Sequence, residues 1–365
     1  MVVGWGAAVG VAEFGWTDER AAQFGPWAGQ GLVPGRVVKQ ARDLAVVVTD
    51  EGEIQAEVSG RFRRAAGDAA GFPAVGDWVA ARLVPDGRSV IEAVLPRRSV
   101  FARQAAGGVA EAQVMAANVD VVFLLAGLDG DWSVRRIERY VTTAWASGAE
   151  PVIVLNKADL AADLANAVAA TTAAAPGVTV LTTTTLDAHG VDVLRSYLTP
   201  GRTIAVLGSS GVGKSTLVNT LLGDLRLATG PVGQAAKGRH TTTARELVRL
   251  SGGALLIDTP GLRELGLWAD EDSLDRTFDD IDALAPGCRF PDCRHQQEPD
   301  CAVREAVTTG RLDPERLASY LKLRSELEAL KIRTDEKARR LHEKALGRDF
   351  AVRRQEVRRN KPGSR

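Results

Sequence analysis

The chain has 365 residues, enough for about two or three domains that each bury a core, so a single compact domain is not expected. Hydrophobic residues make up 45% and charged residues 25%, and no apolar run approaches the ~20 residues that span a bilayer, which argues against an integral membrane protein. The net charge is zero, but the charge is unevenly distributed along the chain.

The first part of the chain, residues 1–32, is an extension rich in glycine and tryptophan. It lacks the basic start and the apolar core of a secretion signal, and acidic residues such as Glu13 interrupt its apolar positions. We therefore expect a poorly ordered extension on a protein that is not secreted.

Residues 33–102 have the pattern of a small β-barrel. Positions 53–58 alternate between apolar and polar residues, with Ile54, Ala56 and Val58 on one face, as in a half-buried strand. Turn signals separate about five such strands. An OB fold is the leading prediction, and the pattern leaves an SH3-like barrel open. OB barrels often carry single-stranded nucleic acid, and the basic and aromatic residues at 61–64 and 97–103 fit that use.

From residue 103 to 268 the pattern changes to alternating strands and helices. Buried strands are expected at 119–125, 152–155, 203–207 and 255–257, and helices at 135–147 and 214–222. This alternation predicts an α/β domain with a mostly parallel sheet.

The tetrad Asn156-Lys157-Ala158-Asp159 has the chemistry of a guanine-binding loop. The carboxylate of Asp159 can accept from N1 and the exocyclic amine of guanine, whereas adenine lacks that pair of donors. Lys157 is expected along the base plane, and Asn156 is expected to tie this loop to the phosphate loop. The same four residues are also compatible with an ordinary turn, so the interpretation depends on the phosphate motif nearby.

A phosphate-binding loop joins the strand at 203–207 to the helix at 214–222. Its glycines turn backbone N–H groups inward around the phosphates, and the helix start adds positive potential. Lys214 is expected to neutralise the β- and γ-phosphates during catalysis, and Ser215 to ligate Mg²⁺. The residues predicted to contact the nucleotide are Gly208, Ser209, Ser210, Gly211, Val212, Gly213, Lys214, Ser215 and Thr216.

Asp258 and Gly261 extend this site. Asp258 ends the strand at 255–257 and is expected to hold Mg²⁺, while the N–H of Gly261 senses the γ-phosphate. One of the threonines ahead of them is expected to complete the metal shell when GTP is bound. The sequence does not decide between Thr241, Thr242 and Thr243.

The residue that positions the attacking water is not given by the usual pattern. Leu262 stands where many GTPases have a glutamine. His240 is our hypothesis for this catalytic role, because an imidazole can accept or relay a proton near neutral pH. The alternative is that His240 only packs or caps.

These motifs occur in rotated order. In an ordinary GTPase the guanine tetrad comes last, whereas here it precedes the phosphate loop and Asp258. Each motif follows a strand of one parallel sheet, so moving the chain termini preserves the site. The sequence therefore predicts a circularly permuted P-loop GTPase domain that binds GTP or GDP with Mg²⁺.

Residues 269–335 are expected to form a mainly helical domain with a metal site. All three cysteines, Cys288, Cys293 and Cys301, lie within fourteen residues and enclose His295. Four such ligands fill a tetrahedral Zn²⁺ shell, so the site is expected to be structural; buried or reactive thiols are the alternative. Clustered cysteines also favour a reducing cytoplasm.

The last segment, residues 336–365, is a basic tail. Between residues 331 and 365 there are thirteen Lys and Arg against five Asp and Glu. Such a segment favours a polyanionic partner, and a solvated helix without a partner fits the same pattern.

Together these segments resemble the circularly permuted GTPases of small ribosomal subunit biogenesis, the RsgA or YjeQ family. The resemblance rests on residues 73–79 and 117–120, the guanine and phosphate motifs, residues 238–243 and 258–261, and the cysteine cluster. It implies an OB domain, a permuted GTPase domain, a zinc domain, and GTP turnover stimulated by the small (30S) subunit during binding to its 16S rRNA. The family usually has a Ser-Ala pair that contacts the guanine base. This chain has Thr184-Thr185 at that place, and the backbone N–H groups of this pair could still contact the base.

The favoured function is a cytoplasmic, monomeric GTP hydrolase whose nucleotide state controls docking on the small ribosomal subunit. One alternative is a nucleotide-gated RNA-binding scaffold with negligible hydrolysis. Another is an ATP-using P-loop enzyme, which would leave Asp159 idle.

Overall fold

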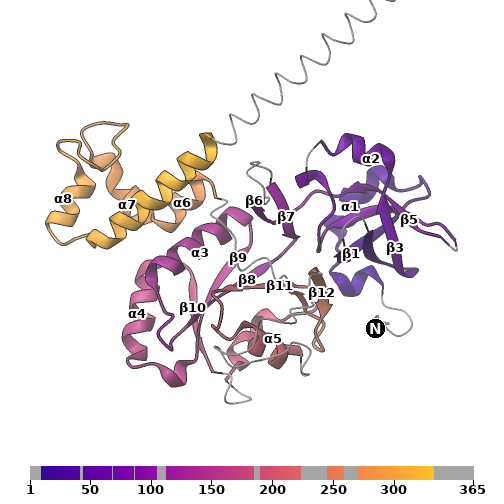
Figure 1. The fold of residues 1–365 in the computed structure, drawn as a ribbon, viewed down its shortest axis with the longest axis horizontal. Helices are drawn as coiled ribbons and strands as arrows, with labels where there is room; N and C mark the ends of the chain where they lie inside the picture. Colours follow the sequence, from indigo (N-terminus) through magenta and orange to yellow (C-terminus); the bar gives the residue numbers. More distant parts are fainter. Residues whose placement is uncertain are drawn as a thin grey trace, which may run out of the picture.

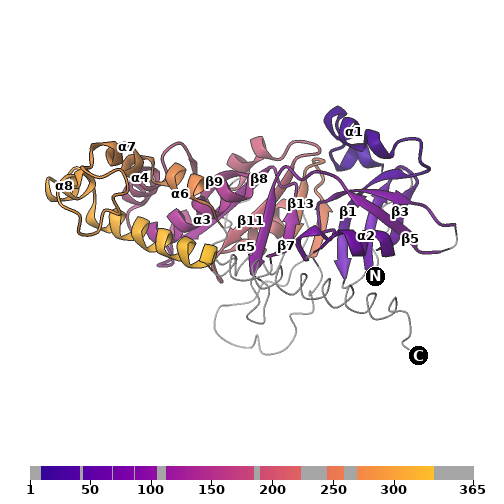
Figure 2. The same cartoon turned by 90° about the horizontal axis from the view of Figure 1, so that it is seen from above.

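Three parts follow one another along the molecule: a β-barrel, a central α/β part, and a C-terminal helical part at the end opposite the barrel (Figures 1 and 2). This computed structural model describes residues 10–41, 44–67, 69–85, 87–104, 112–184, 190–222, 245–258 and 269–332. Over these residues, every helix is too short or too polar to cross a membrane.

The barrel is an OB fold. It closes because β1 pairs with both β2 and β4, while β5 pairs with β4 and, in parallel, with β3. This five-stranded Greek-key closure decides against the SH3-like alternative. The alternation in β3 is confirmed, since Ala56 is buried and its neighbours Gln55 and Glu57 are exposed. The elements are β1 (Val33–Ala41), β2 (Leu44–Thr49), β3 (Gly52–Val58), α2 (Gly60–Ala65), η3 (Ala69–Gly71), β4 (Trp78–Arg82) and β5 (Ser89–Val94).

Residues 10–31 are folded onto this barrel, so the expectation of a poorly ordered extension is wrong for them. Val11 and Phe14 are buried in the core, and Trp16 packs edge-on against Trp78 with ring centroids 4.9 Å apart. Apolar burial of these side chains outweighs the flexibility that the glycine content suggests. The segment contains η1 (Val11–Phe14), α1 (Asp18–Phe24) and η2 (Gly25–Trp27).

The central sheet is continuous with the barrel. Strands β10, β9, β8, β11 and β13 run parallel in that order, β12 is antiparallel to β13, and β12 also pairs with β1 of the barrel. The parallel order agrees with the predicted α/β domain. Its strands are β8 (Val121–Gly127), β9 (Glu150–Asn156), β10 (Thr179–Thr183), β11 (Thr203–Gly208), β12 (Arg245–Arg249) and β13 (Leu255–Asp258).

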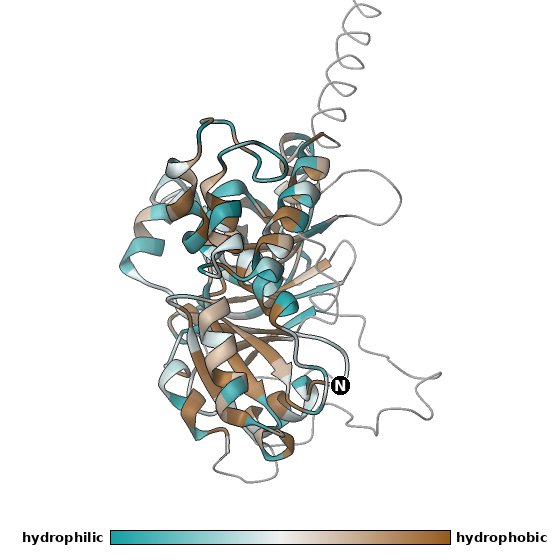
Figure 3. Ribbon diagram, turned by 90° about the vertical axis from the view of Figure 1, so that its left-hand side faces the viewer, coloured by the Kyte–Doolittle hydropathy of each residue, from teal (hydrophilic) through white to brown (hydrophobic). Residues whose placement is uncertain are grey.

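Both faces of this sheet are buried. Along β8, Val122 and Leu124 face a cluster that includes α3, whereas Phe123 and Leu125 face a cluster that includes α5. Such two-sided burial explains the continuous apolar strands, which Figure 3 shows inside a shell of more hydrophilic helices. The helical elements are α3 (Val134–Ser147), η4 (Ala158–Leu160), α4 (Leu164–Ala174), η5 (Asp192–Tyr197) and α5 (Lys214–Leu222).

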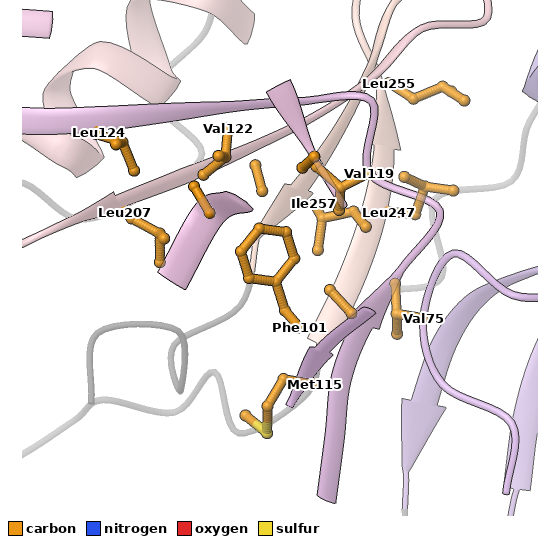
Figure 4. Close-up of a cluster of buried hydrophobic side chains, with 14 of the residues drawn as sticks. Val75, Phe101, Met115, Val119, Val122, Leu124, Leu207, Leu247, Leu255 and Ile257 are labelled. Atoms are coloured by element: carbon orange, nitrogen blue, oxygen red, sulfur yellow. The ribbon is translucent and has the colours of Figure 1, made fainter. Parts of the chain in front are cut away.

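One hydrophobic core joins the barrel to the central sheet. Val75 of the barrel, Phe101 and Met115 of a two-stranded ribbon, and Leu207 and Ile257 of the sheet belong to the same cluster (Figure 4). The ribbon consists of β6 (Val100–Gln104) and β7 (Ala112–Ala117), which are antiparallel. The shared core makes the barrel and the sheet one packed unit.

The C-terminal part is helical and has a core of its own, built around Phe278 and Leu323. It packs on α3, where Thr142 donates to the Thr277 hydroxyl at 3.1 Å. Its elements are α6 (Glu271–Thr277), α7 (Asp279–Leu284), η7 (Ala285–Gly287), α8 (Ala302–Thr308) and a helix over residues 314–332.

Candidate functional site

The predicted nucleotide motifs meet at one edge of the central sheet. Strands β8, β9, β10, β11 and β13 are parallel, and among the described residues the guanine loop, the phosphate loop and Asp258 each lie at the carboxyl end of one of them. Asn156 of β9 lies between Gly127 of β8 and Thr183 of β10 in the register. The tertiary structure therefore places motifs that are far apart in sequence at the edge where ligands of parallel sheets bind.

The phosphate loop, residues 208–213, needs its glycines. Gly213 has φ of 99°, and a Cβ at this position would collide with the side-chain amide of Asn156. A Cβ on Gly208 would lie 2.7 Å from the carbonyl oxygen of Leu125 in the neighbouring strand. The loop ends at α5, whose first turn carries Lys214, Ser215 and Thr216 as the sequence predicts.

Lys214 lies inside this loop. Its side chain is buried, and Nζ donates to the carbonyl oxygen of Gly208 at 2.6 Å and to that of Ser209. Both of these partners are backbone carbonyl oxygens, which phosphate oxygens can replace as acceptors. Ser210 is exposed and Val212 is buried, which anchors the loop while its tip faces solvent.

The guanine loop is bonded directly to the phosphate loop. The buried amide of Asn156 donates to the carbonyl oxygen of Val212 at 2.9 Å, and its oxygen accepts from Thr183 at 3.0 Å. Lys157 donates from Nζ to the carbonyl oxygen of Gly211 at 2.8 Å. Asn156 thus makes the link that its position predicts.

Asp159 lies in η4, beside the loop in which Thr184-Thr185 stands in place of the usual Ser-Ala pair. Its carboxylate accepts from the hydroxyl of Thr184 at 2.6 Å. The side chain of Thr184 therefore contacts Asp159, the residue predicted to bind the guanine base. From the sequence, only the backbone N–H groups of this loop were expected to take part in the site. Ala158 begins the same short helical turn.

Two aspartates that the sequence analysis missed belong to this edge. Asp129 pairs with Lys157, and Asp131 accepts from the hydroxyl of Ser209 and from Arg136, the latter at 2.6 Å. Burial raises the pKa of Asp131, but the hydrogen bonds from Ser209 and Arg136 outweigh it and hold the pKa below its ordinary value. Their position just after the buried strand β8 is the signal that could have identified them.

The remaining predicted nucleotide contacts lie outside the described residues. Asp258 ends β13 at the same edge, but only its backbone is described. The others are Thr185, His240, Thr241, Thr242, Thr243 and Gly261.

The cysteine cluster has the geometry of a metal centre. The four donor atoms of Cys288, Cys293, His295 and Cys301 lie within 4.8 Å of one another. Sγ of Cys288 is 3.8 Å from Sγ of Cys301 and 3.6 Å from Nδ1 of His295. Ligands about 2.3 Å from a tetrahedral metal stand about 3.8 Å apart, so these residues fit one ion.

The loop that carries His295 is held by Glu298. Its carboxylate accepts from the backbone N–H groups of Arg294 at 3.0 Å and Gln296 at 2.9 Å. The backbone N–H of Glu298 itself, and then those of Arg294, Gln296 and Gln297, lower the pKa of Glu298 to about 2. Burial, and then the charge of Arg324, lower the pKa of His295, which favours the neutral imidazole that a metal requires.

Comparisons with known proteins agree with the geometry. A family model described as RsgA GTPase matches residues 94–268. A "Small ribosomal subunit biogenesis GTPase RsgA" from Opitutus terrae is 50% identical over 87% of this chain and 89% of its own length. One of the same description from Streptomyces coelicolor is 42% identical over 90% of both chains.

Solved structures show the same architecture. The crystal structure of YjeQ from Thermotoga maritima has a TM-score of 0.60 and 28% identity, covering 81% of this chain and 99% of that one. The structure of YloQ, described as a circularly permuted GTPase, has a TM-score of 0.58 over 84% of this chain and 96% of that one. At 23% identity this second match supports the fold alone.

Proposed function

The chain belongs to the RsgA family of small ribosomal subunit biogenesis GTPases, and we propose that it couples GTP hydrolysis to a late step in assembly of that subunit. It is a GTP-hydrolysing enzyme with the circularly permuted fold. The observation that carries the proposal is the direct bonding of the guanine loop to the phosphate loop, through Asn156 and Lys157. That bonding makes one site from two motifs whose order in the chain is reversed.

The nucleotide contacts follow from the chemistry of the side chains. Asp159 accepts from the guanine edge, and Lys214 exchanges loop carbonyls for the β- and γ-phosphates. Ser215 and Asp258 would hold Mg²⁺, which when bound neutralises charge on the phosphate oxygens. Because Asn156 fixes the spacing of the two loops, base recognition and phosphate binding act on one rigid frame.

For the hydrolytic step we propose that His240 positions water and that the Gly261 N–H senses the γ-phosphate. The test is single-turnover hydrolysis by His240→Ala. A rate at least tenfold below the unsubstituted protein at saturating GTP is expected, because positioned proton transfer contributes on the order of 10²-fold or more. An unchanged rate with normal GTP affinity removes His240 from catalysis.

The proposed macromolecular partner is the small (30S) ribosomal subunit and its rRNA. Relatives are named for biogenesis of this subunit, and the OB barrel at one end and the metal-binding helices at the other offer two separated surfaces. The decisive measurement is multiple-turnover GTP hydrolysis with and without purified 30S subunits. Stimulation supports the proposal, and an unchanged rate together with tight binding favours the RNA-binding scaffold.

We also infer that the cysteine cluster holds one structural Zn²⁺. The described donors match a closed tetrahedral shell, and Cys301 and His295 are buried among helices of the C-terminal core. Metal analysis of the purified protein tests this, since a chain with intact thiols and no zinc contradicts it. We further propose a monomer that acts in the cytoplasm, where a reducing environment keeps metal-binding thiols available.

A further inference from the structure

A second cleft lies at the amino-terminal edge of the central sheet, opposite the nucleotide loops. Its volume is about 780 Å³, within the range of small-molecule sites. Residues just ahead of β8, β9, β11 and β13 form one side, and the folded N-terminal segment forms the other. Gly15 and Gly201 approach so closely that a Cβ on Gly15 would lie 2.5 Å from the Gly201 carbonyl oxygen, which fixes the two sides together.

The lining of this cleft is positively charged. Among the described lining residues the acidic ones are Glu13 and Asp120, and Asp120 accepts from the backbone N–H of Thr203 at 2.7 Å. Two further carboxylates, Glu19 and Glu150, pair with arginines at the rim. The lining arginines are Arg20, Arg36, Arg98, Arg202 and Arg249.

The arginines in the floor are held by protein groups. Arg36 is buried and donates to the carbonyl oxygens of Phe14, Gly76 and Asn118 and to the Thr203 hydroxyl. Burial lowers the pKa of Arg36 to about 10, and the nearby charge of Arg20 contributes to that shift. The floor therefore supplies fixed positive potential and few free donors.

Arg249 at the rim is different. Its NH1 group pairs with Glu13 at 3.2 Å, while Nε is buried and has no hydrogen-bond partner within the described part of the chain. A buried donor without an acceptor is costly, and this one belongs to a side chain that lines the cleft. About a third of the Arg249 side chain is exposed, so the guanidinium has to turn before Nε can meet an incoming oxygen atom.

We propose that this cleft is a second ligand site that binds a phosphate group, with Arg249 Nε as a donor and Arg98 and Arg202 as rim cations. Guanidinium groups match the planar array of phosphate oxygens better than any other side chain does. Trp16, partly exposed at the wall, offers an aromatic surface to whatever carries the phosphate. The phosphate comes from a free phosphorylated small molecule or from a strand of RNA.

The test is isothermal titration of the full chain with inorganic phosphate and, separately, with a single-stranded uridine trinucleotide, at saturating GDP and Mg²⁺. Arg249→Gln is expected to weaken binding about tenfold, while the control Arg88→Gln, an exposed arginine on the barrel, leaves it within about twofold. GDP affinity should be the same in all proteins. Arg202→Gln is a second variant, expected to weaken binding in the same direction if Arg249→Gln does not fold.

The two ligands distinguish the sources of the phosphate. Binding of phosphate with no gain for the trinucleotide supports a free small molecule, and a trinucleotide affinity higher by about tenfold supports RNA. No binding of either ligand up to about 10 mM overturns the proposal. Equal affinities in Arg249→Gln, Arg202→Gln and Arg88→Gln also overturn it, because binding then occurs elsewhere.

Discussion

Docking of the C-terminal helices on the central domain depends on a buried ion pair between Arg316 and Glu138. Arg316, with 7% of its side chain exposed, donates to Glu138 at 3.0 Å, to Asp280 at 2.8 Å and to the carbonyl oxygen of Ala174 at 2.8 Å. Burial lowers the pKa of Arg316, but the hydrogen bond and charge of Asp280 and the charge of Glu138 outweigh it, so the pKa lies above its ordinary value. Arg316 is therefore a fixed charge that needs its partners.

Glu138→Gln should loosen this docking strongly. Removing one partner of a buried pair costs about 3–5 kcal/mol, and we take about 3 kcal/mol because Asp280 still faces Arg316. That cost corresponds to roughly a hundredfold in the opening equilibrium. The matched control is Glu326→Gln, which breaks a pair with Arg139 at 2.7 Å across the same interface. The side chains of Arg139 and Glu326 are each about a third exposed, so breaking this pair is expected to cost about 0.5 kcal/mol of docking free energy.

Amide hydrogen exchange measures this difference peptide by peptide. A single unfolding free energy is poorly defined for a chain with several cores, whereas exchange reports local opening. Peptides from the helix at 314–332 should exchange about a hundredfold faster in Glu138→Gln and about twofold faster in Glu326→Gln, with barrel peptides unchanged. Equal exchange in the two variants would refute the reasoning, because burial would then add nothing to the pair.

Three further predictions concern the nucleotide site, the metal centre and the N-terminal segment. Asp159→Asn should weaken GTP binding by about tenfold or more and improve binding of xanthosine triphosphate, whose C2 carbonyl accepts from the new amide; unchanged GTP affinity would leave Asp159 without a role. Cys301→Ser should lower the zinc content of the purified protein and speed exchange in the C-terminal helices, and a full complement of zinc would count against the assigned shell. Phe14→Ala should destabilise the barrel by about 3 kcal/mol, so that barrel peptides exchange their amide hydrogens roughly a hundredfold faster, against less than about 1 kcal/mol and about fivefold for Val84→Ala, which is partly exposed; similar exchange in the two variants would mean that the N-terminal segment does not stabilise the core.

Local features were predictable because their signals lie within a few residues. The phosphate loop occurs between β11 and α5 as expected, and α5 has the predicted bounds of residues 214–222. The four metal-binding candidates are close in sequence, and their donors lie together. Glycine spacing, strand alternation and cysteine spacing all act through short stretches of backbone, so the sequence carries them directly.

Nonlocal features required the tertiary structure. The choice of an OB fold rests on the pairing of β1 with β4 and of β3 with β5, which no single segment specifies. Composition suggested disorder for residues 10–31, yet burial of Val11 and Phe14 against the barrel orders them. Asp131 reaches Ser209 across 78 positions of sequence, so its contact with the phosphate loop depends on the order of strands in the sheet.

The sequence by itself predicted the chemistry of this protein: a guanine tetrad, a phosphate loop and a cysteine–histidine cluster that could hold a metal, because the residues of each motif are neighbours in the chain. Only the tertiary structure decided how these parts are joined and what else they form. The Arg316–Glu138 pair links residues 178 positions apart. The arginines of the second cleft are scattered from residue 20 to residue 249. Residues so far apart in sequence come together because the free energy of the whole packed fold favours it. A short stretch of sequence does not contain that information.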